Sequence, residues 1–362
     1  MDEEEFQKFL YFKKLKEAYI EEKKLQLKKL EQDFETNRNF LESSMRNDIE
    51  VDRKHREMVN VCVAPFTEKG SLIDVGYKFI RASPLVEFQS PNVDFLVFKQ
   101  TPKAKIAIFG EAKGSISSPE KIISEFRKRI EIINQKQDYI KTNYLKLQKD
   151  EKVFFEYVIA VPSGYAPDVL NKVIENGGGI IVWHAPVTGH AEISIAFPSK
   201  ILSNRASMMH RDHELNETLS HAKSNRKMFN FFPQVHTVSK LQLLLSTARV
   251  GDAGHIIINS DLKEYLSQDL FYLDEAAIEE EVKSIIDIGL YIGFLETTIE
   301  KDYYHVKARG TKRDTLERQL VDKWVKNQID DRLKVQKEHV TQEIQVKYKA
   351  KRLKEYKTLG DY

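Results

Sequence analysis

Cysteine and long apolar runs are nearly missing from this chain of 362 residues. The single cysteine, Cys62, cannot form an intramolecular disulfide and cannot supply a cysteine-based zinc site. We therefore expect a cytoplasmic protein of the reducing cytosol. No run of about 18 apolar residues occurs, so no membrane-spanning helix is expected. The acidic start Met1-Asp2-Glu3-Glu4-Glu5 is unlike a signal peptide.

A phosphate-binding loop of the Gly-x4-Gly-Lys-Ser/Thr type is also missing, which argues against an ATP-driven motor. Charge of one sign does not dominate, because 57 Lys and Arg balance 55 Asp and Glu to a net charge of +2. This balance neither favours nor excludes nucleic acid, so local clusters matter more than the total. The hydrophobic content of 41% is enough for well-packed cores in two or three domains.

Two neighbouring apolar segments predict a β-hairpin with ionisable residues at one end. Residues 91–98 read PNVDFLVF and residues 105–113 read KIAIFGEAK, with a proline-containing turn signal between them. Successive side chains of a strand point to opposite faces, so Glu111 and Lys113 share a face. A hairpin folded about its centre places Asp94 opposite Glu111. The three ionisable groups are therefore expected to converge.

These three side chains are the groups that a metal-dependent nuclease uses. Two adjacent carboxylates repel each other and raise a pKa unless a cation lies between them. Carboxylate oxygens suit a hard ion such as Mg²⁺. A lysine beside the ion can polarise the attacking water or stabilise charge on a phosphate. The pattern predicts metal-assisted hydrolysis of a phosphodiester. The alternative is a surface hairpin in which Lys113 makes an ordinary salt bridge to a carboxylate.

The order of these residues resembles a known signature. Asp94, followed 17 residues later by Glu111-Ala112-Lys113, is similar to the D…(D/E)-x-K motif of PD-(D/E)XK nucleases, of which restriction endonucleases are the best-known members. The resemblance covers roughly residues 50–200. It implies that Asp94, Glu111 and the backbone carbonyl of Ala112 bind Mg²⁺ and that Lys113 activates the water. One departure is that Asn92 and Val93 stand between the proline and the aspartate, which are usually adjacent in the family.

The resemblance also sets expectations for the fold and for a further acid. It implies a restriction-endonuclease-like α/β (α+β) core with a mixed sheet flanked by helices. Strands at 71–80, 153–161 and 180–184 and helices at 48–63, 118–148 and 167–176 fit such layers. Family members often carry a glutamate on the helix before the first core strand. Glu57 is our candidate for this catalytic role and Glu50 is its rival, although a solvated helix glutamate is the alternative for both.

The pattern of elements predicts four regions. A long N-terminal helix covers 1–41, the nuclease core 42–235, a winged-helix-like module 236–310 and a long C-terminal helix 311–362. Both terminal helices are amphipathic and need a partner surface, which is either the other helix or a second subunit. The module combines helices at 240–249, 260–267 and 274–288 with strands at 289–296 and 303–307. Acidic residues in its third helix would repel phosphate and favour a structural or dimerisation role.

Two segments combine positive groups with amides in the way that DNA recognition requires. The first holds Ser43, Met45, Arg46 and Asn47, and Met45 is a candidate wedge between base steps, with an ordinary core contact as the alternative. The second runs from 204 to 227, and its candidate contacts are Arg205, Arg211 and Arg226. The alternative for this segment is a surface connector.

The expected activity follows from the resemblance. It implies a type II restriction endonuclease that cuts both strands of double-stranded DNA at a short palindromic site. A two-fold symmetric site is matched by a homodimer. A companion DNA methyltransferase in the host would accompany such an enzyme. Two other functions stay open: a structure-selective repair or junction nuclease, and a non-catalytic DNA-binding or scaffold protein in which the acidic cluster is inert.

Overall fold

The computed structural model describes residues 3–12, 15–67, 76–88, 92–101, 104–185, 236–251, 254–310 and 312–359. The chain is an α+β protein whose described part divides into two compact units. One unit holds the terminal helices and comprises 1–48, 289–296 and 306–362. The other comprises 49–288 and 297–305, and contains a five-stranded sheet with its flanking helices.

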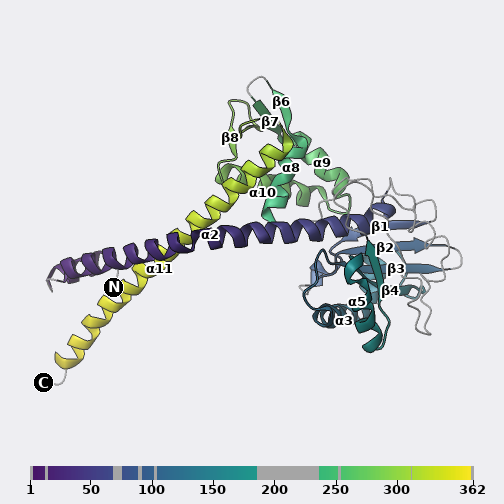
Figure 1. Cartoon of the computed structure of the whole chain (residues 1–362), viewed down its shortest axis with the longest axis horizontal. Coiled ribbons are helices and arrows are strands. Elements are labelled where there is room, and N and C mark those ends of the chain that lie inside the picture. The colour runs from purple at the N-terminus through teal and green to yellow at the C-terminus, as the bar shows by residue number, and fades with distance from the viewer. Residues whose placement is uncertain are drawn as a thin grey trace. The chain divides into compact units, whose positions relative to one another are not determined.

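Long helices form both ends of the chain (Figure 1). α11 (Arg313–Leu359) confirms the helix predicted over the C-terminal region. The predicted N-terminal helix is two helices, α1 (Glu3–Phe12) and α2 (Lys16–Val63). The predicted boundary at residue 41 is wrong, because α2 continues through it for 48 residues without a proline or glycine. None of the helices in the described ranges is both long and apolar enough to cross a membrane.

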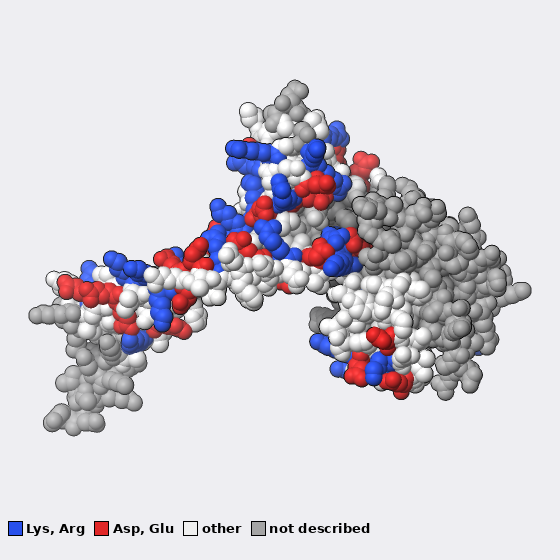
Figure 2. All heavy atoms as spheres, in the orientation of Figure 1, with Lys and Arg blue, Asp and Glu red and all other residues white. Residues whose placement is uncertain are grey.

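The terminal helices pair with each other within one chain. Arg46 of α2 lies 2.7 Å from Asp322 of α11, Lys337 lies 2.5 Å from Glu31, and Lys347 pairs with Glu22. The residue numbers of the paired side chains increase along α2 while they decrease along α11, so the two helices are antiparallel. Charges of both signs are interspersed along them (Figure 2). A buried cluster joins α1, α2 and α11 through Phe6, Phe9, Leu10, Tyr19, Ile344 and Tyr348.

The five-stranded sheet has the order β1-β2-β3-β4-β5. β1 (Tyr77–Ala82), β2 (Phe95–Gln100) and β3 (Lys105–Ala112) are antiparallel, whereas β4 (Phe154–Pro162) and β5 (Ile181–Ala185) continue the sheet parallel to β3. The predicted turn between β2 and β3 is confirmed by the hydrogen bond from Thr101 N–H to Ala104 O at 2.9 Å. The mixed sheet expected from the alternation of strands and helices is therefore present.

Helices connect the parallel strands. α3 (Pro119–Gln135) begins at Ser118, whose hydroxyl accepts from Lys121 N–H, and α5 (Ala166–Glu175) links β4 to β5. The continuous helix predicted over 118–148 is wrong. α3 ends at Gln135, where Lys136 N–H is shared by two carbonyls, and a short α4 (Gln137–Tyr139) and a π-helical turn (Ile140–Tyr144) follow. Single turns at Ala64–Phe66, Val86–Phe88 and Ser163–Tyr165 complete this unit's connections.

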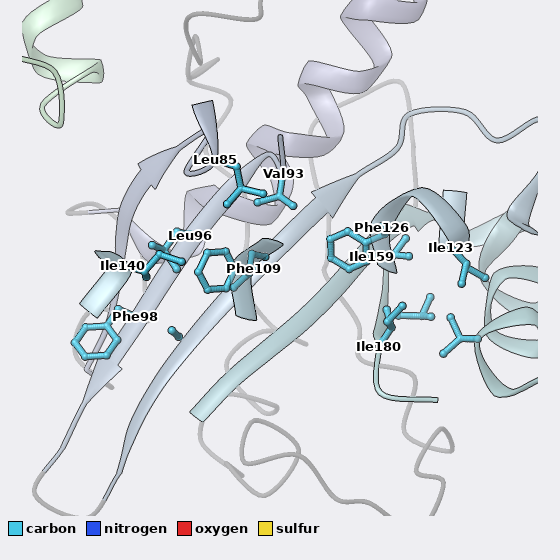
Figure 3. Packing of buried hydrophobic residues seen from close by; sticks show 14 of the residues in the cluster. Leu85, Val93, Leu96, Phe98, Phe109, Ile123, Phe126, Ile140, Ile159 and Ile180 are labelled. Atoms are coloured by element: carbon cyan, nitrogen blue, oxygen red, sulfur yellow. The ribbon is translucent and has the colours of Figure 1, made fainter. Parts of the chain in front are cut away.

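The sheet buries a separate apolar cluster on each face. The face covered by α3 and α5 carries Leu96 of β2, Phe109 of β3 and Ile159 of β4 (Figure 3). The opposite face packs Trp183 against the C-terminal end of α2 around Val59. Full burial of a valine, leucine, isoleucine or phenylalanine side chain contributes roughly 1.5–3 kcal/mol to the stability of the fold. Both faces of the sheet are therefore covered by apolar side chains.

The region after residue 236 forms a smaller helix and strand module. It contains α8 (Thr237–Thr247), β6 (Arg249–Gly251), β7 (Gly254–Ile258), α9 (Asn259–Asp269), α10 (Glu275–Tyr291), β8 (Leu295–Thr297) and β9 (Tyr303–Val306), with the strand order β6-β7-β9-β8. The predicted helix 240–249 ends earlier, and the β6–β7 hairpin was not predicted. The predicted strand 289–296 is also wrong at its start, because α10 continues to Tyr291. Gly293, two residues beyond this helix end, has a φ of +66°, a conformation common just after helices.

Candidate active site

The predicted pairing of Asp94 with Glu111 is confirmed by the register of the β2–β3 hairpin. Phe95 pairs with Gly110, and the Asp94 N–H donates to Gly110 O at 2.9 Å, so Asp94 lies opposite Glu111. A Cβ atom at Gly110 would lie 1.8 Å from the Phe95 ring. Only glycine fits under this ring, and the two residues therefore fix the register immediately beside the carboxylates.

Asp94 is held as an anion by two donors. Its Oδ2 accepts a hydrogen bond of 2.6 Å from the Ala112 N–H, and its Oδ1 lies 3.2 Å from His55 Nε2. Burial opposes the charged carboxylate, but the charges of His55 and Lys113 and the Ala112 N–H outweigh it and lower the pKa of Asp94. Conversely, burial disfavours the charged ring of His55, yet the Asp94 charge raises its pKa.

Glu111 is more deeply buried and only partly satisfied. Its side chain is 3% exposed, and its Oε1 pairs with Lys113 Nζ and, at 2.6 Å, with Arg129 Nη1 from α3. Burial and the neighbouring Asp94 charge raise the pKa of the Glu111 carboxyl, although Lys113 and Arg129 act in the opposite direction. Among the described residues, none forms a hydrogen bond with the other oxygen, Oε2, which is buried. A buried, unpaired carboxylate oxygen is costly, so a cation bound to it would be stabilising.

Lys113 lies directly after the last residue of β3, and its side chain is partly exposed. Its backbone N–H donates to Ala160 O of β4 at 2.9 Å, which ties the residue to the end of the parallel sheet. Its side chain is 26% exposed, whereas the Glu111 side chain with which it pairs is almost fully buried. Lys113 therefore connects the buried carboxylate to the solvent side of the site.

The helix side chain at this site is His55, and the prediction of Glu57 is not supported. Glu57 pairs with Arg53 on its own helix, and Glu50 pairs with the same arginine at 2.6 Å. Residues two apart on a helix do not face each other, so the turn that points His55 at Asp94 directs Glu57 elsewhere. His55 carried no sequence signal of its own. Gly114 leads to His55 only once the fold is known, because the α2 backbone passes close to this glycine.

Asn92, two residues before Asp94, has a structural role. Asn92 is buried, and its Oδ1 accepts hydrogen bonds from Leu85 N–H at 2.7 Å and Val93 N–H at 2.9 Å. The Ser83 N–H in turn donates to Asp94 O at 3.1 Å. The Asn92 side chain thus links Leu85, which follows β1, to Val93, which precedes Asp94.

The donor set suits a hard divalent cation. Asp94 and Glu111 offer carboxylate oxygens on adjacent strands, and the free Glu111 Oε2 is the atom that such an ion would satisfy. No group of three or more His, Cys, Asp or Glu side chains is gathered as a metal centre within the described ranges. The candidate site has two carboxylates, so its remaining ligands would be a main-chain carbonyl, water or phosphate.

The structure separates the predicted DNA contacts. Met45 is 3% exposed, so the expectation of a wedge between base steps is wrong and the core alternative holds. Arg46 forms an ion pair with Asp322, while Ser43 and Asn47 are exposed on α2. The candidates Arg205, Arg211 and Arg226 lie outside the described residues.

Comparisons with known proteins do not identify this site. No protein-family model matches the chain, and no curated protein or solved structure is similar to it. The assignment of a function therefore depends on the geometry of Asp94, Glu111 and Lys113 and on the chemistry that these groups can perform.

Proposed function

We propose that the protein is a Mg²⁺-dependent endodeoxyribonuclease with a PD-(D/E)XK-type core, which hydrolyses phosphodiester bonds in double-stranded DNA. The observation that carries the proposal is the convergence of Asp94, Glu111 and Lys113 at one strand edge, with a buried Glu111 oxygen that has no partner. An inert surface hairpin would not keep a 3% exposed carboxylate in this state.

Each residue of the chain has a distinct role in this proposal. Asp94, Glu111 and the Ala112 carbonyl would hold the ion, which would supply positive charge to stabilise the phosphate oxygens. Lys113 Nζ orients the attacking water for in-line attack. Arg129 keeps Glu111 in place through its bond to Oε1. His55 keeps Asp94 ionised, so that the aspartate stays ready to bind a cation.

Cleavage of both DNA strands requires two such sites, since one site attacks one strand. We therefore propose a homodimer that acts as a type II restriction enzyme on a short palindromic sequence. A host that makes such an enzyme would also need a companion DNA methyltransferase. The paired terminal helices bury their shared apolar residues inside one chain, so that particular cluster is not needed for dimer formation.

We assign the module of α8 to β9 to the winged-helix type. One helix, a β-hairpin of two strands, two further helices and a closing hairpin follow each other, and β9 lies between β7 and β8 in the sheet. The acids of α10 are neutralised within the module, because Lys263 bonds Glu275 and Glu279 at 2.7 and 2.6 Å and Lys240 bonds Glu281. Because these two lysines are engaged by the acids of α10, they offer little free positive charge to a phosphate, so the module serves packing or dimerisation and not base recognition.

The test is cleavage of long duplex DNA with Mg²⁺, beside an EDTA control and two lysine variants. Lys113→Ala removes the proposed water-orienting group and should lower the rate about 100- to 10,000-fold. Lys105→Ala is the matched control, because Lys105 lies at the other end of β3 and pairs with Glu151. Discrete fragments that vanish with EDTA and Lys113→Ala, and persist with Lys105→Ala, support the proposal.

Other outcomes select the rival functions. A smear, nicking or preference for flaps and branches would favour a structure-selective nuclease with the same chemistry. Intact DNA in every reaction, together with retained binding, would overturn the catalytic proposal and favour a DNA-binding or scaffold role.

A further inference from the structure

A second pair of polar side chains lies at the same edge of the sheet as the candidate active site. β3, β4 and β5 are parallel, so their C-terminal ends meet at one edge. Glu111 and Lys113 end β3, Ser163 directly follows β4, and His184 lies near the end of β5. Ligands of parallel α/β sheets bind beyond the carboxyl ends of the strands.

The register places His184 on the same face as the active-site residues. Glu111 pairs with Ile159 across β3 and β4, and Ile159 pairs with Val182 across β4 and β5. His184, two residues beyond Val182, therefore points to the same face as Glu111 and Lys113. Two strand spacings of about 4.8 Å separate β3 from β5, so His184 lies about 10 Å along the edge from Lys113.

Ser163 and His184 form a hydrogen-bonded pair. The Ser163 Oγ lies 3.1 Å from His184 Nδ1, and both side chains are half-buried. This contact uses Nδ1, so Nε2 is the ring nitrogen that Ser163 does not engage. Burial lowers the pKa of His184 and is the sole cause of the shift, so no carboxylate in the described part of the chain charges this ring.

These features distinguish the pair from a nucleophile and its base. In a serine hydrolase the histidine contacts the serine through one nitrogen, while a carboxylate orients the other nitrogen. At His184 no carboxylate of the described residues shifts the pKa of the ring, and the serine contacts Nδ1, the ring nitrogen nearer the main chain. With a neutral ring the pair offers one outward donor: His184 Nε2–H when the Ser163 hydroxyl donates to Nδ1, or the Ser163 hydroxyl when Nδ1–H donates to Oγ. A single neutral donor of this kind suits an oxygen of a phosphate.

We propose that Ser163 and His184 form a second phosphate subsite, which binds a backbone phosphodiester of the cut DNA strand beside the scissile one. The inference rests on the proposed nuclease function, since that function places DNA along this edge. A separation of about 10 Å corresponds to at most three nucleotide steps, because each step advances about 3.4 Å along the helix axis. The subsite thus positions the strand and takes no part in bond cleavage.

The test uses the duplex sequence that the wild-type protein cuts, with one phosphate at a time replaced by a neutral methylphosphonate. Substitutions cover three nucleotides on each side of the cut, and binding is measured on the uncut complex with Lys113→Ala. One position away from the scissile phosphate should weaken binding about tenfold, the effect of a lost hydrogen bond to a charged group. When Ser163→Ala or His184→Phe is added to the same protein, a methylphosphonate at that position should no longer weaken binding. A methylphosphonate at the scissile position should weaken binding as before.

The outcomes separate this inference from the proposed function. Suppose the wild-type protein cuts DNA, but each flanking methylphosphonate weakens binding in Ser163→Ala and His184→Phe as much as it does without these changes. That result would overturn the subsite and leave the nuclease function intact. If His184→Phe does not fold, the binding measurements on the smaller change Ser163→Ala alone test the subsite. Failure of the wild-type protein to cut any duplex would overturn both proposals.

Discussion

Gly114 and His55 meet through their backbones. A Cβ atom at Gly114 would lie 2.5 Å from the His55 backbone nitrogen and 2.3 Å from the carbonyl carbon of Lys54. Such distances are too short for any side chain, so α2 can lie against the end of β3 only because residue 114 is glycine. This approach is what brings His55 to Asp94.

We predict that Gly114→Ala is destabilising and lowers cleavage. The added methyl group meets helix backbone that cannot rotate away, so the free energy of unfolding should fall by about 1–3 kcal/mol. His55 would also move away from Asp94. Urea denaturation measures the first effect and the rate of DNA cleavage the second.

Gly164→Ala is the matched control for this change, because no atom of the described residues lies within 4 Å of a Cβ atom there. It should leave stability close to that of the wild type. Equal stability of the two variants would show that α2 does not lie against the end of β3.

A second prediction separates His55 from Glu57. His55→Ala removes the donor at Asp94 Oδ1, and loss of a group that orients a metal ligand typically costs about 10- to 100-fold in activity or metal affinity. Glu57→Gln alters only a pairing with Arg53 on the surface of the same helix. Cleavage rates and Mg²⁺ titrations should therefore show a large loss for His55→Ala and little change for Glu57→Gln. The reverse ranking would restore the role first expected for Glu57.

A third prediction concerns Tyr157 and alkaline pH. Burial raises the pKa of Tyr157 from 10 to about 12, and its hydroxyl donates to Asn134 Oδ1 at 2.8 Å. Between these pH values the unfolded chain releases a proton that the folded protein keeps, so stability is lost as the pH rises. Tyr157→Phe removes this loss.

The measurement is urea denaturation of both proteins at pH 8, 10 and about 11. Wild type should lose more stability over this interval than Tyr157→Phe, although the variant starts lower because it lacks the hydrogen bond. Parallel losses in the two proteins would mean that the Tyr157 hydroxyl titrates like that of an exposed tyrosine.

The candidate site could be predicted from sequence to the extent that it depends on local pattern. Alternating faces and a turn signal were enough to place Asp94 opposite Glu111, and the observed register agrees. Contacts from distant segments could not be predicted in this way. Arg129 reaches Glu111 from α3, and its place on that helix face follows only from how α3 packs on the sheet.

Helix ends show the same limit. The apolar periodicity continues past Gln135 to Ile140 and Leu145, with no proline or glycine between them, so the break at Lys136 left no mark in the sequence. Gly293, in contrast, did mark a boundary, but it was placed inside a strand because Leu290, Tyr291 and Ile292 form an apolar run. Short apolar runs fit a helix end and a strand equally well.

The burial of Met45 leads to the last prediction. Met45→Ala removes a side chain that is 3% exposed, and truncation of a buried methionine costs about 2–5 kcal/mol. Phe40→Ala on the same helix removes a larger side chain that is 73% exposed, and it should cost little. Urea denaturation of the two variants therefore tests whether exposure, and not size, decides the loss.

DNA experiments on the same pair decide between a core residue and a wedge. A wedge acts by kinking the duplex, so its removal would abolish DNA bending while leaving the protein's stability almost unchanged. A core residue gives the opposite result: lower stability, with unchanged bending and cleavage per folded molecule. We expect the second result, measured by the mobility of circularly permuted DNA fragments at a temperature where Met45→Ala is still folded. Lost bending in a fully stable Met45→Ala protein would contradict the burial of this side chain and return α2 to the DNA interface.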